Sequence, residues 1–332
     1  MKLYRLLKIV NRIKSPRLKM FGLWCAHVSG RRYYGVFFDP IFGCNYRCQM
    51  CYFSDAEIRR TKHGRMTEEQ INTAAKNLFP QALKLQIGCG AEPTIDMKAT
   101  LMLIRLGEQH KVPYISVTTN GALLTKETLS EMAEAGLDEL TISLHGTTRE
   151  TYERLMGPTA KFDTFLGLLQ TIREVKASHP ALKVRVNYTM NADNVDELAQ
   201  FDDLFADTPI DCLQLRPIRK MGETEYQNFD LQHVAESLET IVKPLAERCQ
   251  KRGITVLMPE KIHIERFAQT QTSDARSRLL GSLAYQNVSP ESESLSRPEH
   301  LGRLMWQAIW RSNKWCESIK TELNTPMNYD IR

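Results

Sequence analysis

The feature that most constrains this chain is a loop with three cysteines in eight residues. Cys44, Cys48 and Cys51 follow one another with C-x3-C-x2-C spacing, and no fourth cysteine lies nearby. Thiolates are soft ligands that suit zinc or iron–sulfur clusters. A structural zinc ion usually takes four protein ligands, whereas a cubane cluster held by three thiolates keeps one iron open to a small molecule. The spacing favours such a cluster over a zinc site completed by a distant His or Cys, and over three unligated thiols.

Length and composition place the chain among globular proteins. It has 332 residues, of which 42% are hydrophobic and 25% charged, enough for one large α/β domain with an appendage or for two ordinary domains. Because no run of about 18 uninterrupted apolar residues occurs, we expect no transmembrane helix. The N-terminus lacks the apolar segment of a signal peptide, and eight cysteines are too sparse for a disulfide scaffold. These features favour a cytoplasmic protein.

The basic charge belongs to the N-terminal end. Residues 1–38 contain nine Lys and Arg and no Asp or Glu, which leaves 35 basic against 39 acidic residues in the rest. Residues 2–14 predict a basic amphipathic helix, ended by Pro16. This helix could dock on the domain with its charges in solvent, make peripheral contact with a membrane, or bind an acidic partner. No motif or aromatic interleaving points to nucleic acid, so none is expected as a partner.

From residue 34 the chain alternates strand-like and helix-like segments. The predicted strands are Tyr34–Phe38, Leu83–Cys89, Tyr114–Thr119, Glu139–Leu144, Val184–Met190 and Cys212–Pro217. Helical patterns follow near 67–79, 97–110, 126–135, 162–178, 195–205 and 231–252. Six such units predict an α/β fold with a parallel sheet, helices outside it, and a site at the carboxyl ends of the strands.

We expect three segments along the chain. These are a basic helical segment at 1–33, the α/β domain at 34–258, and a C-terminal α-rich extension at 259–332. Residues 254–258 could add a short strand. The Ser-, Glu- and Pro-rich residues 286–299 predict a flexible loop, and a last helix should contain Trp306 and Trp310.

Short motifs end three of the predicted strands. The second strand is followed by Gly88-Cys89-Gly90-Ala91-Glu92-Pro93, the third ends in Thr119-Asn120-Gly121, and the fourth runs into Ser143-Leu144-His145-Gly146. Together with the cysteine loop, this order resembles the radical S-adenosylmethionine (SAM) superfamily, and in particular its members with C-terminal SPASM/twitch-type extensions. The resemblance covers roughly residues 34–220 and implies a partial (β/α)6 TIM-like barrel.

The resemblance implies two cofactors and a set of residues around them. Cys44, Cys48 and Cys51 would hold one [4Fe–4S] cluster, and its open iron would bind SAM. The residues that would contact SAM are Met50, Gly88, Gly90, Glu92, Thr119, Asn120, Ser143 and Asn187. Arg154 is a further candidate for the SAM carboxylate, with a surface ion pair as the alternative.

The chain also departs from the family pattern. Ala91 replaces a glycine, His145 stands where aspartate is usual, and Met50 replaces an aromatic residue. Only Cys316 lies in the last 80 residues. We therefore expect no auxiliary cluster, although extended members of the family carry several cysteines there.

The reaction implied by the resemblance is the one-electron cleavage of SAM to methionine and a 5′-deoxyadenosyl radical, which abstracts hydrogen from a substrate. The electron would come from an external donor such as flavodoxin or ferredoxin. The fourth-strand motif favours a peptide or protein substrate, and a small molecule or sugar is the alternative. A non-catalytic iron–sulfur or zinc protein is the competing class, which the ordered strand-end motifs disfavour. The sequence leaves the substrate, the bond changed and the oligomeric state open.

Overall fold

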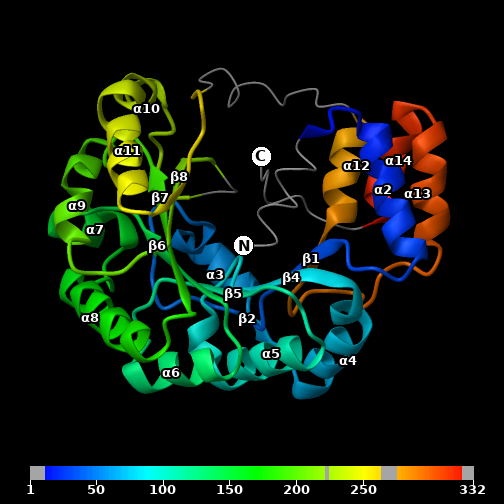
Figure 1. Cartoon of the computed structure of the whole chain (residues 1–332), viewed down its shortest axis with the longest axis horizontal. Helices are drawn as coiled ribbons and strands as arrows, with labels where there is room; N and C mark the ends of the chain where they lie inside the picture. The colour runs from blue at the N-terminus through cyan, green and yellow to red at the C-terminus, as the bar shows by residue number, and fades with distance from the viewer. Residues whose placement is uncertain (1–11, 221–223, 263–274, 324–332) are drawn as a thin grey trace.

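The computed structural model of the chain describes residues 12–220, 224–262 and 275–323. Its main sheet has eight parallel strands in the order β10-β1-β4-β5-β6-β7-β8-β9. These strands are β1 (Tyr34–Phe38), β4 (Ala82–Ile87), β5 (Ile115–Thr119), β6 (Glu139–Leu144), β7 (Lys183–Met190), β8 (Cys212–Pro217), β9 (Thr255–Leu257) and β10 (Tyr285–Val288). Within the described residues the edge strands β10 and β9 do not pair with each other. The sheet is therefore an open, partial barrel (Figure 1).

Helices alternate with these strands and cover the outside of the sheet (Figure 1). They are α4 (Glu68–Leu78), α5 (Met97–Gln109), α6 (Lys126–Glu134), α7 (Arg149–Met156), α8 (Phe162–Ser178), α9 (Phe201–Leu204), α10 (Gln232–Ser237) and α11 (Lys243–Lys251). The outward strand residues Leu85 and Ile115 lie against α5 so closely that a Cβ on Gly107 would meet their side chains at 3.1 and 2.9 Å. Close packing of this kind fixes the apolar face of the sheet toward the helices.

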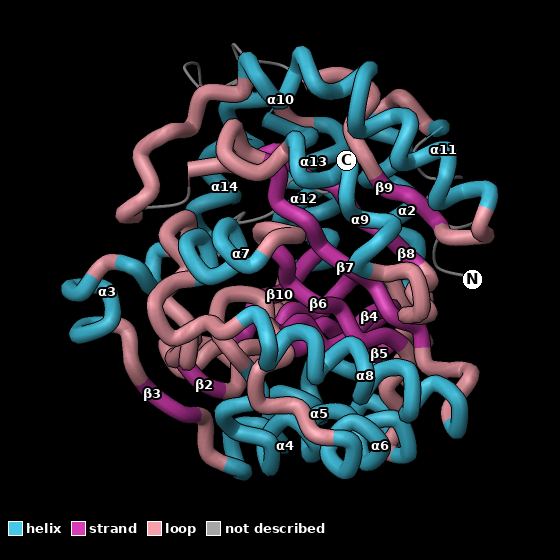
Figure 2. Tube along the Cα trace, turned by 90° about the vertical axis from the view of Figure 1, so that its left-hand side faces the viewer, coloured by secondary structure: helices cyan, strands magenta, loops and turns pink. Residues whose placement is uncertain are grey.

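A small antiparallel sheet stands at the carboxyl end of the barrel strands. It pairs β2 (Ile41–Phe42) with β3 (Gly64–Arg65), and the helix α3 (Ala56–Thr61) lies between them in sequence. Figure 2 shows β2, β3 and α3 projecting at one end of the main sheet. The cysteine loop runs between β2 and α3, so it lies at this end.

Four helices from the two ends of the chain form a separate bundle beside β10 and β1. They are α2 (Pro16–Val28), α12 (Ala275–Ala284), α13 (Leu301–Trp310) and α14 (Asn313–Glu322), with α2 packed on α13 and α12 (Figure 1). Pro16 begins α2, because Ser15 accepts a hydrogen bond from the Leu18 N–H as its cap. Residues 2–11 of the predicted amphipathic helix lie outside the described residues.

The predicted fold class is confirmed, with differences in detail. The parallel sheet has eight strands: β9 confirms the short extra strand expected at 254–258, whereas β10 adds a strand at the other edge that the sequence did not predict. Residues 286–288 of the predicted flexible loop are part of β10. No local sequence pattern predicts that this strand pairs with β1. On α8, the helical spacing of Phe162, Phe165, Leu166 and Leu169 predicts one buried face, but Leu166 is 40% exposed, whereas the neighbouring Phe165 is 1% exposed.

No helix among the described residues is long and apolar enough to cross a membrane.

The aromatic contact between α7 and α8 predicts a local test of the fold. Phe165 is buried and its ring lies near those of Tyr152, Phe162 and Phe205. We expect Phe165→Ala to lower the free energy of unfolding by about 3–5 kcal/mol, because it removes buried ring contacts and leaves a cavity. Leu166→Ala, one residue along, should cost less than about 1 kcal/mol. Urea unfolding of both variants checks this, and equal losses would contradict the packing described.

Candidate active site

The three cysteines of the loop share a partly buried environment. Burial raises the pKa of the Cys44 thiol to about 12, and the charges of Glu92 and Cys51 add to this shift. The pKa of Cys48 is raised by burial and by the two other thiols, and burial also raises that of Cys51. Three crowded thiols of this kind cannot ionise together without a compensating cation, so the donor set fits an iron–sulfur cluster. In the described part of the chain, no three His, Cys, Asp or Glu side chains already form a converged metal site.

The loop is held against the end of α7 and the residues after it. The Gln49 N–H donates to the Leu155 carbonyl at 2.9 Å, and the Thr159 hydroxyl donates to the Asn45 carbonyl at 2.8 Å. Gly157 has φ +96°, and a Cβ there would lie 2.3 Å from the Arg47 carbonyl oxygen. Only glycine fits a positive φ with the loop backbone so close.

The loop backbone is also braced from within. The Arg47 guanidinium donates to the carbonyls of Cys44 and Tyr46 at 2.5 and 2.7 Å. The Cys51 N–H donates to the Cys48 carbonyl at 2.9 Å. These contacts fix the backbone that carries the three thiols.

The turn after β4 is clamped by a buried carboxylate that sequence analysis did not single out. Asp39, directly after β1, accepts hydrogen bonds from the N–H groups of Cys89 (2.7 Å) and Gly90 (3.0 Å). Burial raises the pKa of Asp39 to about 6 against the opposing effect of these N–H groups. The Tyr52 hydroxyl, next to the third cysteine, donates to the Gly90 carbonyl. An acidic residue at the end of a strand-like run was the signal in the sequence.

At two positions of this turn, the backbone conformation or a close contact requires glycine. Gly88 has φ +79°, and a Cβ there would lie 2.4 Å from the Thr118 carbonyl oxygen. At Gly90 a Cβ would lie 2.8 Å from the Tyr52 hydroxyl. The turn therefore runs tightly against the next strand and the cysteine loop, which leaves no room for a side chain at either position.

Glu92 ties the turn after β4 to the end of β5. One carboxylate oxygen accepts hydrogen bonds from the hydroxyls of Thr94 and Thr119 at 2.5 and 2.6 Å, and the other accepts from the Asn120 N–H at 2.8 Å. Burial raises the pKa of this carboxyl group. Both carboxylate oxygens of Glu92 therefore have hydrogen-bond partners within the protein.

Asn120 connects this network to the cysteine loop. Its amide donates to the Asn45 side chain at 2.8 Å and lies 3.9 Å from the Cys44 sulfur. The structure thus brings together the predicted residues Cys44, Glu92, Thr119 and Asn120 from three separate segments.

The remaining predicted residues are Met50 on the cysteine loop, and Ser143 and Asn187 on β6 and β7. Met50 is buried, and its sulfur accepts a hydrogen bond from the Asn191 amide at 3.0 Å. Ser143 on β6 is opposite Asn187 on β7 in the parallel register. The Asn187 Oδ1 atom and the His145 Nδ1 atom are buried without a hydrogen-bond partner. Such orphaned polar atoms indicate a site for a polar ligand.

Two further side chains near these strand ends are His145 and Arg154. Burial, and then the charge of Arg216, lower the pKa of His145 to about 4, so its imidazole is neutral at pH 7. Arg154 pairs with Asp193 at 3.0 Å on the half-exposed surface. The ion-pair alternative for Arg154 is therefore the one that the structure contains.

The face of the sheet opposite the helices is polar, which sequence analysis missed. Gln86 donates to Thr118 at 3.2 Å, and Lys84 donates to Gln86 at 2.8 Å. Arg185 pairs with Glu139 at 2.9 Å and donates to Gln214 at 3.2 Å. The signal was strict alternation in β6–β8, where every second residue is polar, whereas buried parallel strands usually read as continuous apolar runs.

The fold is a partial parallel barrel, and the site combines a three-cysteine loop with a glycine turn at the carboxyl ends of the strands. This combination is typical of one class of protein. The sequence profile of the Radical SAM superfamily matches residues 39–205. The chain belongs to this superfamily and is one of its enzymes. Enzymes of the superfamily use a [4Fe–4S] cluster and SAM.

Curated relatives match this chain over part of its length. A protein named "Probable GTP 3′,8-cyclase" from Sulfurisphaera tokodaii is 26% identical over 211 residues, which is 63% of this chain and 64% of that protein. One of the same name from Thermococcus kodakarensis is 28% identical over 224 residues, covering 65% and 69%. The chain thus spans less than two thirds of the length of the Sulfurisphaera relative.

Solved structures share the fold. Streptococcus suis SuiB bound to S-adenosylmethionine superposes with a TM-score of 0.57 at 17% identity, over 77% of this chain and 58% of that one. The structure of anSMEcpe with bound AdoMet gives a TM-score of 0.53 at 16% identity, over 68% and 63%. At such identities the likeness concerns the fold alone.

The clamp on Gly90 predicts a defect in SAM binding. We expect Asp39→Asn to weaken SAM affinity about 10-fold, because the amide gives the two N–H groups one neutral acceptor in place of a carboxylate. Iron content should stay at the wild-type level. Equilibrium binding of SAM to cluster-loaded protein measures the change.

Asp96→Asn is the matched control. Asp96 is also buried, but it caps α5 through the Ala99 N–H and pairs with Arg65. SAM affinity should stay unchanged in this variant. A similar loss in both variants would contradict the specific role of Asp39.

Proposed function

We propose that this chain is a radical SAM enzyme whose cluster is held by Cys44, Cys48 and Cys51, and which abstracts hydrogen from a substrate bound in the open barrel. The observation that carries the proposal is the crowding of three thiols on a loop braced by the strand-end motifs of β4 and β5. When both are bound, the cluster would supply the electron that cleaves SAM, and SAM would supply a radical able to abstract hydrogen. The electron would come from an external donor such as flavodoxin or ferredoxin.

The chain's own residues would bind and orient SAM. The turn at Gly88 and Gly90 would receive the methionine part of SAM, and Asp39 and Glu92 hold that turn in place. Thr119 and Asn120 act through the same network. Across the barrel, Ser143 and Asn187 would hold the ribose or carboxylate, which the orphaned Oδ1 atom of Asn187 supports. Met50 would lie against the adenine through its sulfur.

The polar inner face of the sheet favours a polar substrate with an anionic group. On the inner face of the described strands, Lys183 is exposed at the start of β7 and pairs with Asp211, and the other charged side chains are three basic ones and Glu139. The buried carboxylates Asp39 and Glu92 follow the strands and accept hydrogen bonds from N–H and hydroxyl groups of the protein. The basic residues are Lys84, Arg185 and Arg216. The charge of Arg216 also acts on the neutral His145. A carboxylate or phosphate would be stabilised in such surroundings.

This charge supports the small-molecule alternative over a peptide or protein substrate. The name of the curated relatives refers to GTP, which is anionic. One structural neighbour, SuiB, was solved with the precursor peptide SuiA. A peptide substrate of this chain would have to present an acidic side chain or a carboxyl terminus to the barrel.

The cluster assignment predicts a clear difference among the cysteines. We expect Cys44→Ala, Cys48→Ala and Cys51→Ala each to lose the charge-transfer absorption of the cluster and the formation of 5′-deoxyadenosine from SAM under reducing, anaerobic conditions. Cys316→Ala is the control, since Cys316 is buried in the helical bundle with its thiol 3.9 Å from the Ala308 carbonyl.

The Cys316→Ala variant should keep about four irons per chain, as the wild type does. Eight irons in the wild type that fall on this change would refute the single cluster. If reduced, cluster-loaded wild type forms no deoxyadenosine even with cell extract as a source of substrate, the proposed enzyme activity is wrong.

The substrate class predicts how activity follows the charge of the substrate. We expect the component of cell extract that stimulates deoxyadenosine formation to bind an anion-exchange resin. Arg216→Gln should lower this stimulation at least 10-fold, because a charge-assisted hydrogen bond is lost, while the slow cleavage of SAM without substrate continues. Lys183→Gln, at the far end of the same face, should respond like wild type. A stimulating fraction that flows through the resin would argue against an anionic substrate.

A further inference from the structure

The helical bundle carries a continuous apolar face that the barrel does not use. Among the described residues, seven large hydrophobic side chains are exposed, and five of them lie on α2 and α13. These are Leu18 (55%), Phe21 (43%), Val28 (57%), Trp306 (41%) and Trp310 (66%). We call the surface they form the α2–α13 face. Scattered single exposures are normal, but a gathering of this kind marks an interaction site.

Ring contacts join the two helices into one surface. The ring centroids of Phe21 and Trp24 are 5.9 Å apart, those of Trp24 and Trp306 are 4.7 Å apart, and those of Trp306 and Trp310 are 5.9 Å apart. Leu18, Phe21 and Val28 follow one stripe along α2, because they are three and seven residues apart. The face is therefore a continuous ladder of rings with aliphatic side chains beside it.

The surroundings of this face are strongly basic. Arg12, Lys14, Arg17 and Arg31 are exposed on and around α2, and residues 1–38 contain no acidic residue. Arg303 on α13, and Arg311 and Lys314 after it, are also exposed. The sequence just before α2 has the same character, since Leu3, Leu6, Leu7 and Val10 alternate there with Lys and Arg.

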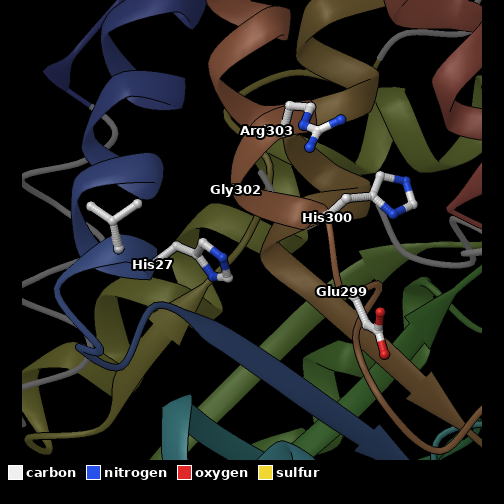
Figure 3. Close-up of a pocket in the computed structure, with 6 residues that line it drawn as sticks. His27, Glu299, His300, Gly302 and Arg303 are labelled. Atoms are coloured by element: carbon white, nitrogen blue, oxygen red, sulfur yellow. The ribbon is translucent and has the colours of Figure 1, made fainter.

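A shallow surface pocket lies at the end of the same face. Its lining comes from the C-terminal end of α2 and the start of α13, and includes His27, Val28, His300 and Arg303. Figure 3 shows His27 from α2 pointing toward α13, with Glu299 as the acidic side chain at its lower rim. The pocket shares no residue with the cysteine loop or the strand ends, so it is separate from the candidate active site.

We infer that the α2–α13 face binds the surface of an anionic lipid bilayer. Tryptophan and phenylalanine rings are suited to the boundary between headgroups and acyl chains, and surrounding Lys and Arg are attracted to anionic lipids. The exposed aliphatic side chains Leu18 and Val28 can insert among the acyl chains at such a boundary, whereas they cannot form favourable contacts with the phosphates of a nucleic acid. The pocket beside Val28 gives a headgroup a recess next to Arg303.

A second copy of the chain fits the face less well. A two-fold contact would place this face against its own copy. The basic residues of α2 and the region around α13 would then face the same basic residues across a dehydrated contact. Like charges in that position cost binding energy, whereas an anionic bilayer compensates them.

The tryptophans supply a direct probe of this binding. All four tryptophans of the chain lie in this bundle: Trp24 on α2, Trp306 and Trp310 on α13, and Trp315 on α14. Full-length, cluster-loaded protein is mixed with vesicles of phosphatidylcholine containing 30% phosphatidylglycerol. We expect a blue shift of tryptophan emission, quenching by lipids brominated near the headgroup, and co-flotation with the vesicles. Vesicles of phosphatidylcholine alone, or 0.5 M salt, should lower the bound fraction at least 10-fold.

Variants locate the binding surface. Phe21→Ser combined with Trp310→Ser should weaken vesicle binding at least 10-fold, and so should Arg17→Glu combined with Arg303→Glu. Leu166→Ser is the matched control, because Leu166 is similarly exposed on α8, away from the bundle, and should bind as wild type. Thermal unfolding curves and iron content confirm that the variants are folded.

Several results would overturn the inference. One is a wild type that stays unbound to anionic vesicles, and another is equal binding to neutral vesicles. A third is binding that the α2–α13 variants retain but that deletion of residues 2–14 abolishes. A fourth is a dimer that forms with rising concentration, resists lipid, and is lost in the Phe21→Ser, Trp310→Ser variant. None of these results bears on the proposed radical SAM chemistry, which is measured by deoxyadenosine formation.

Discussion

The rest of the site depends on the hydrogen bonds of the buried Glu92 carboxylate. It joins the turn after β4 to the end of β5 through Thr119 and the Asn120 backbone, and the Glu92 N–H itself donates to Gly43 at the start of the cysteine loop. A buried charge of this kind is tolerated only when every oxygen has partners, as here. The network therefore fixes three segments, distant in sequence, at one point, and Asp39 repeats the arrangement on the other side of the glycine turn.

The two faces of the sheet differ in polarity. The outward residues are apolar and packed on the helices, as the close approach of α5 at Gly107 shows. The inward residues form a hydrogen-bonded polar layer that runs from Lys84 through Gln86 to Thr118, and from Glu139 through Arg185 to Gln214. Buried ion pairs such as Arg185–Glu139 contribute little to stability compared with apolar packing. Their presence is better explained by a polar ligand than by the needs of the core.

The bundle of α2, α12, α13 and α14 adds a second kind of surface. The α2–α13 face combines exposed rings with a basic surround, at the edge of the barrel formed by β10 and β1. The helical bundle is thus built from both ends of the described chain, and the barrel edge that it covers is completed by a strand from the C-terminal part.

The sequence by itself determined the repeating β/α order, since six predicted strands and the long α8 stand where periodicity placed them. It also determined the cysteine spacing, because this spacing depends on the type of ligand, and it placed glycines directly after β4. Tertiary structure decided what depends on contacts between distant segments. Asp39 became a clamp only when β1 lay beside β4, and β10 became a strand only by pairing with β1. The exposed ring ladder exists because helices about 280 residues apart pack together, and no local pattern encodes that contact.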